Sequence, residues 1–506
     1  MTNPIAIPER TYRFAPLDRT GVLLGLSGGQ CALVGLGILI GGGLLRAGTN
    51  PAVSLVSLVV GVVLALGSWD GRRIHEVLPL LGRHRMVQLS GRAAWRAPLP
   101  LLSGWDADRA KQPALPPFLA GLELFDAGRV AWAPTVDGVG VVHDRRERTL
   151  SATLSVRGAE FSLVERSEQD RILAGWGDVL GGFCTERGTL SRVRVTEWAA
   201  PSGIGEHERF VADHAQPENA AARASYDALL AQAGPTAVTH EVLVTVTVDL
   251  RKVRGRSGEQ PEDIGTDTLL EELRLLAGRL EASGLLPGAP LSVALTATAL
   301  RQRLDPSVVR SGARRRATTL AEAAGLVAPW NAGPLATETA WDHLTADGSM
   351  HRTYWIAEWP RLDVAPNWLE PMLLHAGGIR TFALHYEPVA PSRSQRRIDR
   401  DSTRLAADEE QRNRSGFRIG AHLRRAQSAV LEREAELVGG FSELEYAGFV
   451  TVSASDRDTL DRSCAEYEQV AAQAGLELRP LDGRHDLAVV CSLPLGRGLA
   501  PKRGIG

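Results

Sequence analysis

Two adjacent uncharged segments near the N-terminus constrain this chain most. Residues 20–45 and 47–69 contain no charged side chain, and only Arg46 separates them. A helix needs roughly 20 predominantly apolar residues to cross the hydrocarbon core of a bilayer, so each segment is long enough. A secretory signal peptide has an apolar region of about 7–15 residues followed by a cleavage site, whereas here a second apolar segment follows directly. The pattern therefore predicts a transmembrane helical hairpin over residues 20–69.

Arginines flank the predicted hairpin and indicate its orientation. Three precede it and four follow it closely, namely Arg10, Arg13, Arg19, Arg72, Arg73, Arg83 and Arg85. The turn between the two apolar segments carries only Arg46. Because arginines accumulate on the cytoplasmic side of membrane helices, we expect both chain ends and the main body in the cytoplasm. The hairpin would then lie in the inner (plasma) membrane.

Small residues recur at four-residue spacing in both apolar segments. They are Gly21, Gly25, Gly29, Gly37 and Gly41 in the first segment, and Ser57, Gly61 and Ala65 in the second. Small side chains let helix backbones approach closely in lipid, where packing holds helices together. Two interpretations stay open: these residues pack the two helices against each other, or they form a docking face for another membrane subunit.

Composition restricts the classes of function. The 506 residues are enough for roughly two to four domains besides the hairpin. The formal net charge of −2 shows no excess of positive charge, so no direct nucleic-acid site is evident. The four cysteines are far apart and form no CxxC pair, which favours reduced thiols over a zinc site or a disulfide framework.

Composition and pattern divide the chain into segments. They are a cytosolic basic-aromatic arm (1–19), the transmembrane hairpin (20–69), a juxtamembrane helix with a proline-rich connector (70–117), a cytosolic α+β domain (118–300), a mixed linker (301–348) and a second cytosolic α+β region with a long charged helix (349–506). We expect the arm to lie extended at the membrane surface, because aromatic and arginine side chains suit the headgroup region.

Strand and helix patterns alternate along the body. Residues 149–157 alternate apolar and polar side chains like a half-buried strand, and residues 268–282 carry leucines at helical spacing. Residues 291–300 are interpreted as a further strand, and residues 392–437 as one or two long, exposed, charged helices. The predicted fold class is α+β, with the two-helix hairpin followed by a cytosolic body of repeated β-α-β units, of which ferredoxin-like halves are one form.

The sequence does not decide the role of two arginine clusters in the body. Arg314, Arg315 and Arg316 lie in the mixed linker, and Arg393, Arg396 and Arg397 lie at the start of the charged helix. A basic triplet is usually a solvated loop or helix end. The alternative for the linker triplet is contact with an acidic partner surface or lipid headgroups. The helix cluster could contact lipid, DNA or nothing.

No nucleotide-binding motif is present. A P-loop requires a Gly-Lys pair, because the lysine reaches the nucleotide phosphates, and none of the three lysines follows a glycine. The sequence Gly138-Val139-Gly140 begins like a dinucleotide fingerprint, but His143 stands where the third glycine belongs. This pattern favours a hairpin turn.

No catalytic set emerges either. A G-x-S-x-G match at residues 25–29 falls inside a predicted membrane helix, whereas a nucleophile elbow needs a strand-to-helix turn. His240-Glu241 lacks the second histidine of an H-E-x-x-H zinc motif. Asp342-His343 and His485-Asp486 are isolated pairs with no nucleophile near them in the sequence. We therefore predict no catalytic, cofactor-binding or metal-binding residues and no enzymatic activity.

Tryptophans gather in the last third of the chain, at Trp330, Trp341, Trp355, Trp359 and Trp368. Aromatic side chains near strands are usually part of a core. The alternative is an anchor surface for another protein, where tryptophan and arginine are enriched.

Several short motifs follow one another along the chain. They are the arm and hairpin (8–85), LSATLSVRGA at 150–159, Gln169-Asp170-Arg171 with Trp176-Gly177, and a terminal Ser492-Leu493-Pro494-Leu495-Gly496. In this order they resemble a family of integral membrane proteins encoded with conjugation machinery in actinobacteria. The arm and hairpin look like the small inner-membrane subunit of type IV secretion systems. The body looks like the N-terminal domain of the conjugation ATPase without its motor domain.

The resemblance implies a non-enzymatic, membrane-anchored scaffold subunit of a secretion or conjugation apparatus. It would form an oligomer and present a cytosolic platform to a separate motor ATPase and other channel subunits. The missing motor domain agrees with the missing P-loop. Two alternatives remain open: an inner-membrane ring component of a type VII secretion system, and a membrane-tethered hydrolase or transferase with an unrecognised site.

Overall fold

An antiparallel sheet of thirteen strands organises the body of the protein. The computed structural model describes residues 12, 14, 28–69, 72–98, 115–133, 138–158, 161–201, 210–211, 213–214, 220–233, 238–253, 260–307, 327, 329–414 and 421–499. Helices and strands alternate through these residues, so the predicted α+β class is confirmed.

The strands of the sheet are β3 (Ala94–Arg96), β4 (Leu122–Asp126), β5 (Gly140–Asp144), β6 (Thr149–Arg157), β7 (Leu190–Pro201), β8 (Val238–Asp249), β9 (Leu286–Pro290), β10 (Ala336–Thr339), β11 (Leu344–Ala346), β12 (Ser349–Glu358), β13 (Ile379–Pro388), β14 (Leu444–Ala454) and β15 (Glu477–Pro480). A separate ribbon pairs β1 (Ser68–Trp69) with β2 (Arg72–Arg73).

The helices are α1 (Gly28–Arg46), α2 (Pro51–Leu66), α3 (Ile74–Leu89), α4 (Arg166–Gly181), α6 (Ala220–Ala233), α7 (Pro261–Ala282), α8 (Val293–Leu304), α11 (Glu370–Leu373), α12 (Pro391–Arg414), α13 (Ala421–Val438), α14 (Arg457–Gln473) and α15 (His485–Val489). Short 3-10 turns are η3 (Phe161–Leu163), η6 (Pro329–Asn331) and η7 (Val490–Ser492).

The same order of elements occurs twice along the chain. The first unit (149–290) runs β6-α4-β7-β8-α7-β9, and the second unit (349–480) runs β12-α11-β13-β14-α14-β15. In both units the fourth strand pairs with the first, the first with the third, and the third with the second. The second strands, β7 and β13, pair with each other and join the units into one sheet.

Buried threonine pairs mark equivalent positions in the two units. Thr153 and Thr245 are paired across β6 and β8, and their hydroxyl oxygens lie 2.9 Å apart. Thr353 and Thr451 are paired across β12 and β14, again with hydroxyl oxygens 2.9 Å apart. Each pair begins at the fifth residue of the first strand of its unit. The matching topology and pairs relate the units by a local two-fold axis near Thr196, which pairs with Ala383.

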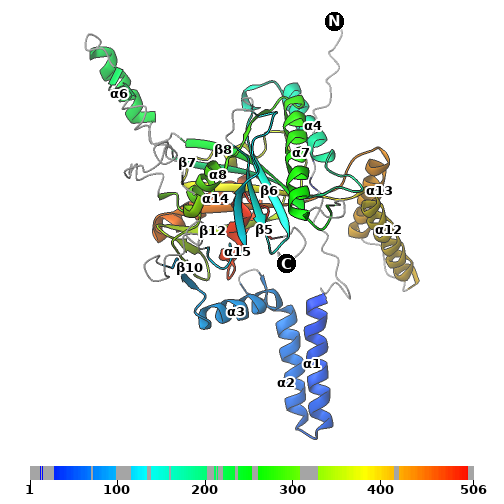
Figure 1. The fold of residues 1–506 in the computed structure, drawn as a ribbon. Coiled ribbons are helices and arrows are strands. Elements are labelled where there is room, and N and C mark those ends of the chain that lie inside the picture. The colour runs from blue at the N-terminus through cyan, green and yellow to red at the C-terminus, as the bar shows by residue number, and fades with distance from the viewer. Residues whose placement is uncertain are drawn as a thin grey trace.

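The two faces of the sheet are covered by different elements. Leucines of α7 at helical spacing pack on the alternating apolar residues of β6, as the sequence predicts, and α14 covers the same face in the second unit. On the opposite face, α15, η7 and the segment up to residue 499 cover the central strands. Figure 1 shows α7 and α4 next to each other beside the strands.

A buried arginine holds the C-terminal segment on this second face. Arg194 is fully buried in β7 and donates hydrogen bonds to the carbonyl oxygens of Val490 at 3.0 Å, Leu493 at 2.6 Å and Arg497 at 2.5 Å. Burial lowers the pKa of Arg194 to about 9. Arg497 in turn forms an ion pair with Asp144 at 2.6 Å. Residues 490–497 are therefore held against this face of the sheet.

Some sequence expectations differ from the structure. Residues 291–300, expected as a strand, lie largely in helix α8, which Ser292 caps by accepting a hydrogen bond from the Leu295 amide at 3.3 Å. Ala297 and Ala299 of this helix are buried, and α8 lies against β4 and β5, so the apolar residues read as one face of a strand belong to the buried side of a helix. Strands β10 and β11 lie in the expected linker, and β3 lies in the expected connector.

The apolar region near the N-terminus forms a pair of antiparallel helices. Among the described residues, α1 is the helix that is long and apolar enough to cross a membrane, and α2 is apolar but only 16 residues long. Residues 20–27 lie outside the described residues. The prediction of two full spans is therefore supported for one helix, because the second ends at Leu66 and is followed by β1. Figure 1 shows the pair projecting from the body.

The two arm residues that the structure describes, Tyr12 and Phe14, pack on the body. Tyr12 pairs with Val364, and the Phe14 ring stacks on Trp359. The prediction of an extended arm at the membrane surface did not include these contacts with the body. Tryptophan side chains of the second unit provide contacts that no local sequence pattern reveals.

Acidification is expected to destabilise the fold through His351. The ring is buried in β12, with Nε2 2.8 Å from the Leu304 carbonyl and Nδ1 2.8 Å from the Ser453 hydroxyl. Burial lowers the pKa of His351 to about 4. An unfolded histidine takes up its proton near pH 6.5, so below that pH the unfolded state binds more protons. Between about pH 6.5 and 4 this histidine removes about 3 kcal/mol from the free energy of unfolding.

The measurement is the unfolding midpoint of the detergent-solubilised protein from pH 7.5 to 4. Stability should fall as pH falls, and His351→Gln should make that dependence shallower. The exposed His214 supplies the control, since His214→Gln should leave the slope unchanged. Equal slopes for the two variants would contradict the assignment.

Candidate functional site

Two of the dipeptides that the sequence singled out are tied into structural contacts. His240 and Glu241 lie in β8, where the His240 Nδ1 is 2.7 Å from a Glu197 carboxylate oxygen and Glu241 pairs with buried Arg303 at 2.7 Å. Asp342 pairs with His343, Arg352 and Arg457 in an ion network. Glu241 and Asp342 each already have a cationic partner.

The other glycine and histidine motifs also have structural positions. Gly138 lies in the connection between the paired strands β4 and β5, and His143 is in β5. Part of this connection, residues 134–137, lies outside the described residues, so the predicted hairpin turn stays a prediction. His485 is buried under β12, where its Nδ1 accepts a hydrogen bond from the Thr353 amide at 3.2 Å. Of residues 25–29, only Gly28 and Gly29 are among the described residues.

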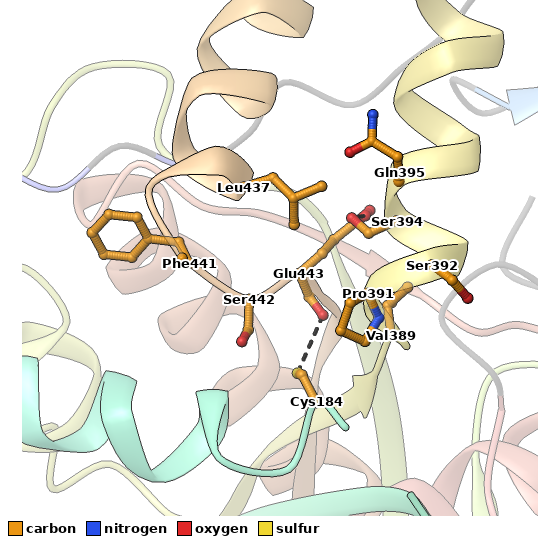
Figure 2. A pocket seen from close by; sticks show the side chains of 11 residues that line it. Cys184, Val389, Pro391, Ser392, Ser394, Gln395, Leu437, Phe441, Ser442 and Glu443 are labelled. Carbon is orange, nitrogen blue, oxygen red and sulfur yellow. Dashed lines mark hydrogen bonds between the residues drawn. The ribbon is translucent and has the colours of Figure 1, made fainter. Parts of the chain in front are cut away.

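A cavity of about 450 Å³ lies at the root of the α12–α13 hairpin (Figure 2). Its lining residues come from the end of β13, the start of α12, the end of α13 and the loop after α4, and are Cys184, Val389, Pro391, Ser392, Ser394, Gln395, Leu437, Gly440, Phe441, Ser442 and Glu443. The hairpin itself confirms the prediction of long charged helices over residues 392–437.

The charges around this cavity neutralise one another. The Glu443 carboxylate accepts a hydrogen bond from Ser394 and lies 3.4 Å from Arg397 and 3.5 Å from Arg433. Arg397 also pairs with Glu445. These contacts fix the α12–α13 hairpin to the sheet.

The arginine clusters can now be placed. Arg397 belongs to the ion network at the hairpin root. Arg396 is exposed and donates to the Ser392 carbonyl of its own helix at 2.9 Å, and Arg393 is exposed. Arg314, Arg315 and Arg316 lie outside the described residues.

The Cys184 thiol is expected to be unreactive. Figure 2 shows the side chain directed at the Glu443 backbone, where the thiol donates to the carbonyl oxygen at 3.4 Å. Burial raises the pKa of Cys184, so little thiolate forms at pH 7. We expect alkylation of Cys184 in the folded protein to be at least roughly tenfold slower than in the unfolded protein. Peptide mass spectrometry of a maleimide time course measures this, and rapid labelling of the folded protein would contradict it.

The small residues of the two apolar helices lie at their mutual contact. Gly37 faces the backbone of Ser57 and Gly61, and Gly41 faces Ser54 and Ser57. Gly61 is likewise packed against Leu33 and Gly37. The interpretation that small residues pack the two helices together is therefore confirmed for Gly37, Gly41, Ser57 and Gly61. Gly29 instead faces His75 of α3. Gly21 and Gly25 lie outside the described residues.

Gln30 links α1 to the end of α2 and to Arg73, which precedes α3. Gln30, buried in α1, donates to the Ala65 carbonyl of α2 at 2.8 Å and accepts from Arg73 at 2.8 Å. It is the one carboxamide within residues 20–45. A single amide in an apolar segment is thus a sequence signal for the junction between α1, α2 and the segment before α3.

Helix α3 connects the pair to the body. Arg83 donates to the Gly483 carbonyl at 2.7 Å and pairs with Asp486 at 2.9 Å, both beside α15. The His84 ring meets the edge of Trp341, with centroids 5.4 Å apart. The His485-Asp486 motif and Trp341 are therefore parts of a joint between the apolar helices and the sheet.

The outer face of α3 is apolar and exposed. Leu78, Met86 and Leu89 are 49%, 73% and 88% exposed, and their spacing places them on one side of the helix. Val77 and His84, on the other side, are buried. Arg85 is exposed on the same side as the apolar residues. A helix with this pattern suits an interface between water and lipid.

The described residues contain no cluster of three or more histidine, cysteine, aspartate or glutamate side chains that could hold a metal ion. Comparison with protein families finds no matching family, and comparison with curated proteins finds no significant match. The fold and the helix pair define the class: an α+β protein with a helix of membrane-spanning length and composition near its N-terminus.

Proposed function

We propose that this protein is a non-enzymatic, membrane-anchored scaffold subunit of a bacterial secretion or conjugation apparatus. The α1–α2 hairpin anchors it in the inner membrane with both chain ends in the cytoplasm. The body presents a platform to a separate motor ATPase and to other channel subunits. The observation that carries the proposal is the close-packed apolar helix pair that α3 joins to an α+β body in a chain without a P-loop.

Two spans are compatible with the length of the second helix. At 1.5 Å per residue, the 16 residues of α2 extend about 24 Å, against a hydrocarbon core of about 30 Å. Local thinning of the bilayer accommodates a short span at modest cost. Leucines and valines of α2 are about half exposed, as the lipid-facing side of a membrane helix requires.

Helix α3 fits the role of a surface helix in this arrangement. Its apolar stripe would enter the headgroup region of the cytoplasmic leaflet, and Arg85 would meet anionic lipid. Its other face holds the body through Arg83 and Asp486. The body would thus be fixed close to the membrane instead of hanging on a flexible linker.

We also propose that each unit is a ferredoxin-like domain. The order β-α-β-β-α-β and the strand arrangement fourth-first-third-second support this assignment. Each unit has its longest insertion between its second and third strands, with α6 in one and the α12–α13 hairpin in the other. These insertions leave the sheet at equivalent places and offer surfaces for partner subunits.

The experiment is affinity capture of the tagged full-length protein from solubilised host membranes, followed by mass spectrometry. We expect a P-loop ATPase together with channel subunits, and the ATPase identifies the type of secretion system. An untagged strain controls for background. Recovery of the protein alone, even after mild crosslinking, would contradict the scaffold proposal.

A further inference from the structure

Three aromatic side chains of the second unit form a groove around Phe14. The Phe14 ring stacks on Trp359 with centroids 5.0 Å apart and meets Trp368 edge-on at 5.2 Å. Tyr446 of β14 completes the groove at 6.4 Å from Phe14 and 5.3 Å from Trp359. Both tryptophans border the buried core of the second unit, so the groove is built on a rigid base.

Backbone and side-chain contacts at Tyr12 extend the same binding mode. The Tyr12 amide donates to the Val364 carbonyl at 3.0 Å, and the Val364 amide donates to the Tyr12 carbonyl at 2.9 Å. The Tyr12 hydroxyl donates to the Asp170 carboxylate at 3.0 Å. Asp170 belongs to α4 of the first unit, whereas Val364 and the aromatic groove belong to the second. The two arm residues therefore bridge the units.

These contacts combine the two elements of strand-type peptide recognition. Paired backbone hydrogen bonds hold an extended segment, and pockets receive side chains two residues apart, which point to the same side of a strand. The hydroxyl contact at Asp170 favours tyrosine over phenylalanine at the first position. The three-ring groove favours an aromatic residue at the second.

We propose that the Trp359, Trp368 and Tyr446 groove, with Val364 and Asp170, is a docking site for an extended Tyr-x-Phe peptide, and that its occupants are this chain's own Tyr12 and Phe14. Tyr12 and Phe14 act as a removable strap across the two units of the body. This inference does not depend on the proposed role in secretion. When Tyr12 and Phe14 leave the groove, another extended Tyr-x-Phe segment can bind there.

The first test locks the strap in the full-length protein. Tyr12 and Val364 exchange both backbone hydrogen bonds, a geometry that brings Cα atoms of antiparallel strands to about 5.5 Å and permits a disulfide. Tyr12→Cys with Val364→Cys should oxidise to a disulfide within one chain. The control is Tyr12→Cys with Leu286→Cys, since exposed Leu286 lies on β9, which β6, β8 and β7 separate from β13.

Each result of the crosslinking test has a clear meaning. A disulfide within one chain, absent from the control, supports the strap. A disulfide between two chains would show that a second copy supplies the arm and would overturn the assignment to the same chain. Absence of any disulfide at 12 and 364 would overturn the docking site itself.

The second test measures recognition by the emptied groove. A fluorescent peptide of residues 8–18 is added to full-length wild-type protein and to Phe14→Ala in detergent. We expect the peptide to bind Phe14→Ala at least tenfold more tightly, because its groove is vacant. Adding Trp368→Ala should weaken that binding at least tenfold, and a peptide with alanine in place of its phenylalanine should bind equally weakly. Equal binding to wild-type and Phe14→Ala protein would overturn the proposal.

Discussion

Replacing Glu197 with alanine is expected to lower the free energy of unfolding by about 3–5 kcal/mol. Glu197 lies in β7 and accepts two hydrogen bonds from the Arg380 Nη1, at 3.0 and 2.9 Å, across the junction with β13. Arg380 is 1% exposed, so the variant would leave a buried charge without its carboxylate partner. Burial already lowers the pKa of Arg380. The loss would fall on the strands that join the two units.

Matched variants distinguish this effect from the loss of an ordinary ion pair. Glu271→Ala removes an exposed pair with Arg274 on α7 and should cost far less stability, because solvent screens this pair. Replacing both partners, with Glu197→Leu and Arg380→Met, should recover most of the stability because no unpaired charge remains. Chemical unfolding of the detergent-solubilised protein measures all three. A loss at Glu197 no larger than that at Glu271 would contradict the account of the junction.

Replacing Gly37 with leucine is expected to force α1 and α2 apart. A Cβ atom at this position would lie 3.1 Å from the Ser57 carbonyl oxygen and 3.2 Å from the Gly61 Cα, both backbone atoms that cannot rotate away. Overpacking of this kind typically costs about 1–3 kcal/mol. We therefore expect a lower unfolding temperature and more aggregation in detergent.

Gly35 supplies the matched control within the same helix. A Cβ atom there meets nothing within 4 Å, so Gly35→Leu should behave like the wild-type protein or fold slightly better. Thermal unfolding and gel filtration of the two variants give the comparison. Indistinguishable behaviour of Gly37→Leu and Gly35→Leu would contradict the close packing of the pair.

Sequence periodicity and charge predicted the longer helices and strands, whose residues repeat a pattern over several turns or pleats. The alternation in β6 and the leucine spacing in α7 were sufficient, because each element buries one face against the other. The mixed charge of α12 and α13 likewise predicted exposed helices. The short strands β10 and β11 have four and three residues, too few to show a period, and they depend on β3 and β12 as partners.

Contacts between distant residues were beyond sequence reasoning. Arg194 finds its hydrogen-bond acceptors about 300 residues away, at Val490 and Leu493. The Phe14 ring packs on Trp359 and Trp368, which are similarly distant in sequence. Tryptophan enrichment pointed to a core or an anchor surface, but only the fold shows that two of these side chains hold the arm. Similarly, His485-Asp486 gave no hint that Asp486 receives Arg83 of α3.

Cysteine labelling tests most directly whether the helix pair holds the body on the cytoplasmic side of a membrane. Ala47→Cys is placed in the turn between α1 and α2, and Leu374→Cys on the body, where that leucine is 60% exposed. Intact cells stripped of their wall are treated with a membrane-impermeant maleimide, with the parent protein as background. The account predicts labelling at position 47 in intact cells and at position 374 only after lysis. Labelling at position 374 in intact cells, or none at position 47 before lysis, would contradict it.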